Sequence, residues 1–470
     1  MFEELVKEIT KELEAKESRG RSRSGDAQNN FEYAVCYILV ELWKASLSYP
    51  QRECTINLRN GYYSELPRYR DNNLTYRQIK AAFDGMINCR MIEITTAGYF
   101  SRERGEGGLT KFISTDKLLE KFEGLEGHPA FQIKPNLNEE TIILRNNIDG
   151  KKVNVPYEDV RKTNLYRSNL KIINECFLRH WADLRIKNTE YTKLAERINE
   201  DSGKEPIDLS RRTLVRIFTK GSFEKGGRFY RGWWQNVPSE YRKFITIDEK
   251  VTTEYDFSQL SPHMLYFAYN KDMGQEDAYD RVLDGQHRKI VKQAFNAMVQ
   301  SSSPLNLKPR KINMDGMDMD WKELRQRVLD AHKPIKDLFF NDEGNKLQFK
   351  DSCIAESVML QFANQNQVAL PIHDSFMMQE GYAGHLEEAM RRAFYDEFEA
   401  DIPLKQEVII ERIALFDEGG NPRIKEVTSD DKEHSQWYDR NTMWLYSKAG
   451  MDRIGDETTS TLGLQFEQKF

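Results

Sequence analysis

The sequence predicts a mixed α and β fold of the α+β class, in which helices precede a small, mainly antiparallel sheet. Apolar residues recur at helical spacing over residues 29–47 and 75–92, and strand-like runs joined by a glycine-rich turn follow at 92–115. Further strand-like runs surround Asp256 and Asp374. The chain has 470 residues, of which 39% are hydrophobic and 11% aromatic, so it can bury large cores in about two to four domains.

The composition limits the location and the partners. The formal net charge is -6 and the pI is near 5.9, so any contact with nucleic acid must use local basic surface. The five cysteines include no C-x-x-C pair, which argues against a zinc cluster or a disulfide framework and favours a cytoplasmic location. The charged N-terminus and the lack of an apolar run of roughly 20 residues predict neither a secretory signal nor a membrane span.

The N-terminal part predicts a flexible arm followed by a nucleic-acid-binding domain. Residues 1–28 read as a polar helix and a basic, Ser/Gly-rich stretch, which we interpret as flexible. Two helices and a β-hairpin within residues 29–150 resemble a winged helix. The second helix and the hairpin tip would supply its nucleic-acid contacts, through Arg77, Lys80, Arg102 and Arg104. The alternative is a small helical domain whose apolar faces pack against a neighbouring domain.

The middle and the end of the chain carry less specific patterns. Residues 151–225 are expected to be mostly helical, and the last helix, around 209–221, would carry the basic cluster Arg211, Arg212, Arg216 and Lys220. Residues 417–470 form a polar tail with few aromatic residues, expected to be partly disordered or to dock onto the rest.

Two aspartates predict a metal site. Asp256 ends a strand-like run, and Asp374 lies in a segment that reads as a tight hairpin. With a main-chain carbonyl exposed by the turn after Asp256, two such carboxylates supply oxygen ligands for a hard cation such as Mg²⁺. Two ions of this kind stabilise the attacking and leaving oxygens in phosphoryl transfer from a nucleoside triphosphate. Taken alone, either aspartate fits a turn or a helix cap.

A polar stripe on a predicted helix suits a triphosphate. Within residues 285–304, the side chains of Arg288, Lys292, Asn296 and Gln300 recur every four residues on one face. The two cations could neutralise phosphate charge, and the two amides would lie further along, toward the sugar and base. The alternative is an amphipathic surface helix.

Four ordered motifs resemble the family A DNA polymerases and their relatives, the single-subunit phage-type RNA polymerases. Asp256 begins D-F-S-Q-L-S, similar to the D-Y-S-Q-I-E palm motif, and Arg288 begins an R-x-x-x-K match to the fingers helix. His373 begins H-D-S, the second metal motif of the phage-type enzymes. An upstream segment is similar to the family's motif near the growing primer end, with Arg228, Gln235 and Asn236. The resemblance covers about residues 226–381, roughly a third of the chain.

The resemblance implies a right-hand polymerase core over residues 226–416, with an antiparallel palm and helical fingers, and a thumb-like region at 151–225. Asp256 and Asp374, assisted by the main-chain carbonyl of Phe257, would then bind two Mg²⁺ ions, for which Mn²⁺ could substitute. Lys292 would act on the leaving pyrophosphate, Arg288 would hold the distal phosphates, and His373 would lie near the primer terminus. The implied partners are a DNA template and primer, contacted by Arg228, Gln235 and Asn236, and nucleoside triphosphates.

The chain departs from the family at the residues expected to contact the incoming nucleotide. Ser261 replaces a glutamate that blocks a ribose hydroxyl in the DNA polymerases, so sugar selection is open. Asn296 and the Gln300-Ser301 pair replace the fingers aromatic residue and the Tyr-Gly pair, so base stacking is lost or supplied elsewhere. We find no acidic constellation typical of a proofreading nuclease. The candidate nucleotide-binding residues are Phe257, Ser261, Asn296 and Gln300.

The leading hypothesis is a compact, template-directed DNA polymerase, and the resemblance alone suggests a replicative role in a phage or mobile element. One alternative is an RNA polymerase or primase-like enzyme that uses ribonucleotides, which Ser261 and the H-D-S motif favour. The other is a catalytically inactive replication initiator or regulator that binds DNA. The retained Asp256, Asp374, Arg288 and Lys292 argue against it, because a buried charge cluster is costly to keep without a use.

Overall fold

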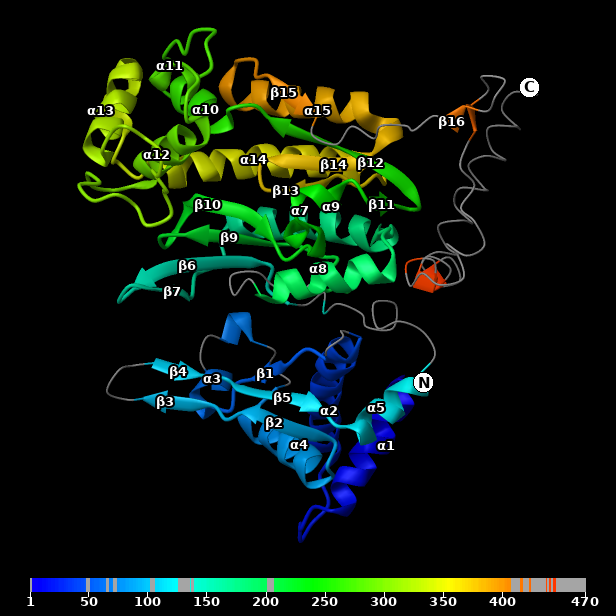
Figure 1. The fold of residues 1–470 in the computed structure, drawn as a ribbon. Coiled ribbons are helices and arrows are strands. Elements are labelled where there is room, and N and C mark those ends of the chain that lie inside the picture. Colours follow the sequence, from blue (N-terminus) through cyan, green and yellow to red (C-terminus); the bar gives the residue numbers. More distant parts are fainter. Residues whose placement is uncertain are drawn as a thin grey trace. The chain divides into compact units, whose positions relative to one another are not determined.

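The computed structural model describes residues 2–406 except 48–50, 65–66, 71–73, 102–105, 126–135, 137–138 and 201–206, and beyond these 415–416, 422–423, 437, 439–440 and 443–444. The chain forms two compact units (Figure 1). Unit one contains Met1–Glu140, Arg185–Arg211 and Lys425–Phe470, and unit two contains Thr141–Leu184 and Arg212–Ile424. In the described part of the chain, no helix is long and apolar enough to cross a membrane.

Unit one packs helices against a small antiparallel sheet. Its helices are α1 (Phe2–Ala15), α2 (Gly25–Ser46), α3 (Asn60–Ser64), α4 (Tyr76–Asn88), α5 (Asp116–Glu123) and α8 (Asn188–Glu200). Its sheet has the order β1-β5-β2, from β1 (Cys54–Ile56), β2 (Ile92–Thr96) and β5 (Thr110–Ser114), and β3 (Tyr99–Ser101) pairs with β4 (Glu106–Gly108). A capping box between Thr75 and Gln78 starts α4. The helices and strands predicted over residues 29–115 are confirmed, and their identity as a winged helix stays a prediction.

The flexible arm predicted over residues 1–28 is wrong. Helix α1 buries one apolar face in the core of unit one, and the Phe2 ring stacks on Trp43 with ring centroids 4.9 Å apart. Arg23 then pairs with Glu14 at 3.0 Å, and its guanidinium carbon lies 3.5 Å from the centroid of the Phe31 ring. The apolar residues of α1 recur at helical spacing between charged ones, so the segment is amphipathic although its composition is polar.

Unit two contains a four-stranded sheet covered by two long helices. The strand order is β10-β9-β6-β7, from β6 (Ile142–Ile148), β7 (Lys151–Asn154), β9 (Val215–Thr219) and β10 (Ser222–Tyr230), and β6 runs parallel to β9. Helix α14 (Glu343–Ala363) packs along β10 and against α7 (Arg161–Arg179), which contacts β6. Helix α7 was predicted, but the strands on either side of it were not.

The basic helix predicted around residues 209–221 is wrong, because this segment forms β9. Arg216 is fully buried there, its Nη1 lies 2.8 Å from Glu356 Oε2, and its Nε donates to the carbonyl of Gly227 at 2.9 Å. Arg212 is also buried and donates to main-chain carbonyls at the end of α7. A short apolar run reads equally as helix or strand, and the distant partner that neutralises Arg216 is invisible in the local pattern.

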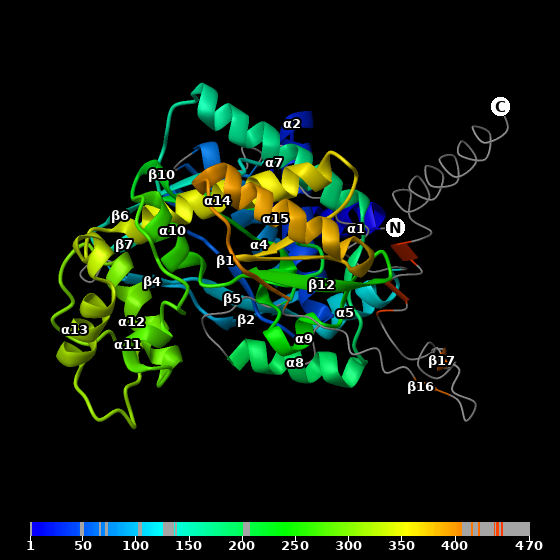
Figure 2. The same ribbon diagram turned by 90° about the horizontal axis from the view of Figure 1, so that it is seen from above.

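A second sheet in unit two is antiparallel throughout. Its order is β13-β14-β12-β11-β8, with β15 also paired to β12, from β8 (Ala182–Leu184), β11 (Ile245–Ile247), β12 (Lys250–Phe257), β13 (Leu370–Ile372), β14 (Ser375–Gln379) and β15 (Leu404–Gln406). Helix α15 (Ala383–Phe398) lies beside α14 (Figure 2). At one end of the unit gather α10 (Leu260–Ala268), α11 (Asp280–Leu283), α12 (Arg288–Gln300) and α13 (Trp321–Ala331). The predicted mixed class and antiparallel sheet are confirmed.

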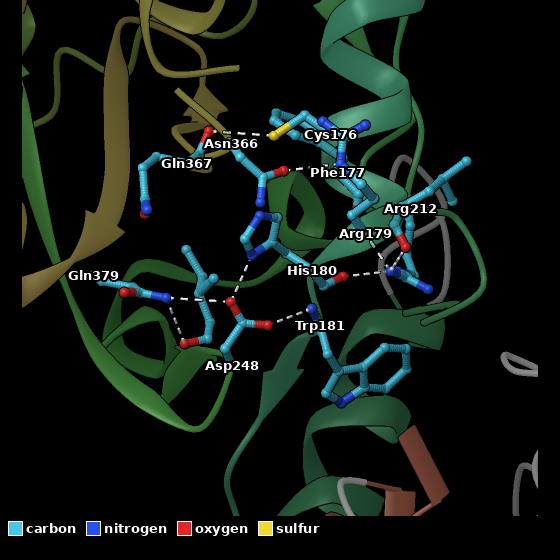
Figure 3. Close-up of polar contacts among 12 residues, drawn as sticks. Cys176, Phe177, Arg179, His180, Trp181, Arg212, Asp248, Asn366, Gln367 and Gln379 are labelled. Carbon is cyan, nitrogen blue, oxygen red and sulfur yellow. Dashed lines mark hydrogen bonds and ion pairs between the residues drawn. The ribbon is translucent and has the colours of Figure 1, made fainter. Parts of the chain in front are cut away.

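A buried polar network ties the end of α7 to this second sheet (Figure 3). His180 Nδ1 and Asp248 Oδ2 are 2.6 Å apart, and the main-chain N–H of Trp181 donates to Asp248 Oδ1 at 2.9 Å. Gln379, at the end of β14, donates to Asp248 at 3.3 Å. Burial lowers the pKa of His180, but the interactions with Asp248 and, after it, Cys176 raise it and prevail, so the pKa is about 9. An ion pair therefore anchors the turn between β11 and β12.

Candidate active site

Asp256 and Asp374 lie on neighbouring strands of the second sheet. Asp256 is close to the end of β12, and Asp374 lies in the two-residue turn between β13 and β14. The antiparallel register pairs Asp256 with Ser375, the residue that follows Asp374. Residues directly opposed in this way have Cβ atoms about 5 Å apart, so the register brings the two carboxylates into one region. Both aspartates are half-buried.

Ser375 fixes the turn that carries Asp374. Its hydroxyl is buried and lies 2.5 Å from Glu254 Oε1 and 3.0 Å from the main-chain oxygen of Ile372. Glu254 in turn pairs with Arg242 Nη1 at 2.9 Å. The serine of the H-D-S motif therefore binds the hairpin to β12.

Gln235 lies where the resemblance implies a nucleic-acid contact, but its amide nitrogen has protein partners. It donates to the carbonyl of Phe229 at 3.0 Å and to that of Pro371 at 3.2 Å, and Trp234 Nε1 donates to Pro371 at 3.0 Å. These bonds hold β13 just before the His373 turn. Asn236 follows at the end of the short 3₁₀ helix η2 (Trp233–Asn236) and is half-buried.

His373 occupies the first position of the turn with φ of 59°. A residue with a Cβ enters this left-handed region at a cost of about 1 kcal/mol, and such strain concentrates at functional sites. Its ring is exposed yet partly desolvated, and this desolvation, together with the positive charge of Arg228, lowers the pKa of His373. Because its pKa is lowered, the imidazole is neutral already at the ordinary pKa of histidine and can accept a hydrogen bond.

Arg228, on β10, links the hairpin to a carboxylate that the sequence did not reveal. Its Nε lies 2.7 Å from Oδ2 of Asp351 on α14. Asp374 also lies within electrostatic range of both side chains and acts on the pKa of each. Burial raises the pKa of Asp351 to about 6, Arg228 opposes this rise and Asp374 adds to it. Three charged groups from β10, α14 and the hairpin thus converge.

The predicted polar stripe lies on α12 as expected. Its opposite face is buried through Val291, Ala294, Phe295, Met298 and Val299. Lys292 and Gln300 are exposed and Asn296 is half-buried. Arg288 pairs with Asp277 at 2.6 Å and with Asp280 at 3.2 Å. Of the two cations, only Lys292 has no ion pair or hydrogen bond with a described residue, and it is open to an anionic ligand.

Tyr279 connects the start of α12 to the aspartates. Its ring centroid lies 5.3 Å from the guanidinium carbon of Arg288, and its edge packs on Phe295. Burial raises the pKa of Tyr279, and both Arg288 and Asp374 act on it through their charges. Tyr279 is thus within electrostatic range of both the start of α12 and the hairpin that carries Asp374.

The other predicted residues are spread over both units. Ser261 is half-buried in the first turn of α10, which begins after Gln259 takes a φ of 52°. In unit one, Arg77 is exposed on α4, and Lys80 pairs with Asp84 at 2.5 Å. Arg102, Arg104 and most of the tail at 417–470 lie outside the described residues.

The donor set at the hairpin fits Mg²⁺. This ion is bound through one or two carboxylates together with substrate phosphates and water, without an all-protein cage. Asp256, Asp374 and the carbonyl of Phe257 match that pattern, and no cluster of three or more His, Cys, Asp or Glu suited to a metal occurs among the described residues. Water and substrate phosphate oxygens would supply the remaining direct ligands of such a site.

No protein-family model matches this chain, and the search of curated proteins found no match either. Among solved structures, the chain is similar to the POL domain of Pol1 from M. smegmatis in complex with DNA primer-template and dNTP, at 12% identity and a TM-score of 0.29. The match covers 86% of this chain and 65% of that chain, so this chain spans less than two thirds of the polymerase domain. A TM-score this low does not establish a shared fold.

Proposed function

We propose that this chain is a template-directed nucleotidyltransferase, a compact DNA polymerase without a proofreading nuclease, that extends a polynucleotide 3'-OH with nucleoside triphosphates. The observation that carries the proposal is the register that pairs Asp256 with Ser375 and so puts Asp374 beside it. Tyr279 is within electrostatic range of Arg288 at the start of α12 and of Asp374, and Arg288 and Lys292 share one face of α12, a cationic surface of the kind a triphosphate needs.

Asp256, Asp374 and the Phe257 carbonyl would hold two Mg²⁺ ions, with Mn²⁺ as a substitute. When bound, these ions stabilise charge on the attacking and leaving oxygens. Lys292 neutralises the leaving pyrophosphate. Arg288 binds the distal phosphates, and it does so by exchanging Asp277 and Asp280 for phosphate oxygens, because both carboxylates already hold it.

The nucleic acid is a DNA primer and template. Arg228 on β10, His373 in the hairpin turn and Asn236 at the end of η2 contact the primer end, while Gln235 holds the hairpin through Pro371. The helices and hairpin of unit one within residues 29–115 form a winged-helix-like module that adds phosphate contacts through Arg77 and Lys80. Ser261, a small residue in the first turn after β12, favours a second candidate that accepts ribonucleotides as an RNA polymerase or primase.

The test is primer extension with dNTPs and, separately, NTPs, on primed and unprimed DNA with Mg²⁺ or Mn²⁺. We expect D256N and D374N to lose product by about 10³-fold or more. The matched control is D396N, which neutralises an exposed aspartate on α15 in the same unit. The proposal is supported if wild type and D396N give product and D256N and D374N do not. The nucleotide set that is preferred shows whether the enzyme selects deoxyribose or ribose. DNA binding without product from either set contradicts it and favours the initiator or regulator.

A further inference from the structure

Asp351 is a buried acid that the proposed chemistry has not yet used. Its side chain is 4% exposed on α14, and its carboxylate bonds Arg228 Nε at 2.7 Å. Burying a carboxylate costs several kcal/mol unless a partner compensates for it, so Asp351 depends on Arg228. The dependence is unequal, because the Arg228 side chain is 29% exposed and could be solvated without Asp351.

Arg228 lies near two carboxylates, those of Asp351 and Asp374. Asp374 lies within electrostatic range of it, but the hydrogen bond that Arg228 forms within the described residues goes to Asp351 through Nε. A guanidinium bound through Nε keeps its two terminal NH₂ groups available for a planar acceptor such as a phosphate or a base edge. The same bond keeps the guanidinium from forming a two-point pair with Asp374, a carboxylate needed for metal.

A second arginine paired to the same helix, Arg216 on β9, shows what a purely structural pair looks like. Glu356, five residues after Asp351 on α14, pairs with Arg216 at 2.8 Å. The Arg216 side chain is 0% exposed, and its Nε and Nη groups bond Gly227, Glu356 and Ser352. All the donor groups of Arg216 thus point into protein, whereas Arg228 retains exposed donors.

We propose that Asp351 is a positioning residue, which orients Arg228 so that its terminal N–H groups bind the primer–template and Asp374 stays free for metal. The inference rests on the proposed function for the identity of the ligand. It predicts that losing a carboxylate weakens the binding of a polyanion. Simple electrostatics predicts the opposite, because removing a negative charge near DNA strengthens binding.

The experiment measures the binding of a fluorescent primer–template by anisotropy without divalent metal, for wild type, D351N, R228Q and E356Q, each checked by thermal unfolding. We expect D351N and R228Q to weaken binding by about 10-fold or more, the loss of one charged hydrogen bond, and the double variant to be no worse than R228Q. E356Q is expected to lose stability but to bind like wild type. In extension assays, D351N should also need more Mg²⁺ for half-maximal rate.

Three results would overturn the inference. These are tighter or unchanged binding by D351N, an equal loss in E356Q, or a double variant clearly weaker than R228Q. If D351N does not fold, R228M is compared with D351L/R228M, in which both charges leave together, and a weaker double variant again refutes a role through Arg228. Absence of polymerase activity alongside the expected binding pattern would sink the proposed function and leave the role of Asp351 in nucleic-acid binding intact.

Discussion

The ion pair between His180 and Asp248 gives a prediction with a fixed sign. The folded protein raises the pKa of His180 from 6.5 to about 9. Each pKa unit corresponds to about 1.4 kcal/mol, so the protonated imidazole stabilises the fold by about 3 kcal/mol. Because the folded pKa is above the unfolded one, this stabilisation is complete below pH 6.5 and disappears as the pH rises through 9.

The assay compares the unfolding of wild type and H180Q in urea between pH 6 and 9.5, with hydrogen exchange as a local probe. The amide of Asp248, which donates to the Trp181 carbonyl at 2.7 Å, reports the network directly. We expect the wild type to exceed H180Q by about 3 kcal/mol at pH 6 and by much less at pH 9.5. A difference that stays constant over this range would refute the assignment of a protonated His180, and D248N should lose the same pH dependence.

Three further changes test other parts of the molecule. Phe2→Ala should destabilise unit one by about 3 kcal/mol in chemical unfolding, since it removes a buried stacked ring, and no effect would restore the flexible-arm interpretation. Ser375→Ala should lower the free energy of unfolding by about 1–3 kcal/mol, because Glu254 loses a buried hydrogen-bond donor. The variant should also slow primer extension without changing the nucleotide KM. An unchanged rate would mean that the turn keeps its conformation without the Ser375 hydroxyl. Lys292→Ala should raise the nucleotide KM or lower kcat by about 10-fold in steady-state kinetics. Lys289→Ala, which changes an exposed neighbour outside the stripe, should alter neither. Equal effects of the two variants would mean that Lys292 contributes only to the overall positive charge of α12.

The secondary structure around the candidate site could be predicted from the sequence. The apolar runs that end at Asp256 and flank Asp374 are short strands with a tight turn, and the four-residue repeat from Arg288 to Gln300 is α12. Period and turn chemistry act over a few residues, so a single sequence contains them. Both aspartates reach one region because their strands are neighbours, which the motif order suggested and the register supports.

The strands and buried charges that surround the site could not be predicted from the sequence. β9 was expected to be a helix, and Asp351 was not singled out, because each depends on a partner far along the chain. An arginine within an apolar run reads as a solvated helix face until Glu356 is known to neutralise it. For α1, the error was different: its polar composition outweighed the helical spacing of its apolar residues.

Helix α14 fixes the position of the strands around the site through two ion pairs. Asp351 and Glu356 bind arginines on adjacent strands, Arg228 on β10 and Arg216 on β9. A buried charge left without its partner costs about 3–5 kcal/mol, so each pair holds only when helix and strand are in register. A slip of one residue in β10 would turn Arg228 to the opposite face of its sheet and leave Asp351 unpaired. The two pairs therefore select one register, and that register determines which arginine faces the hairpin carrying Asp374.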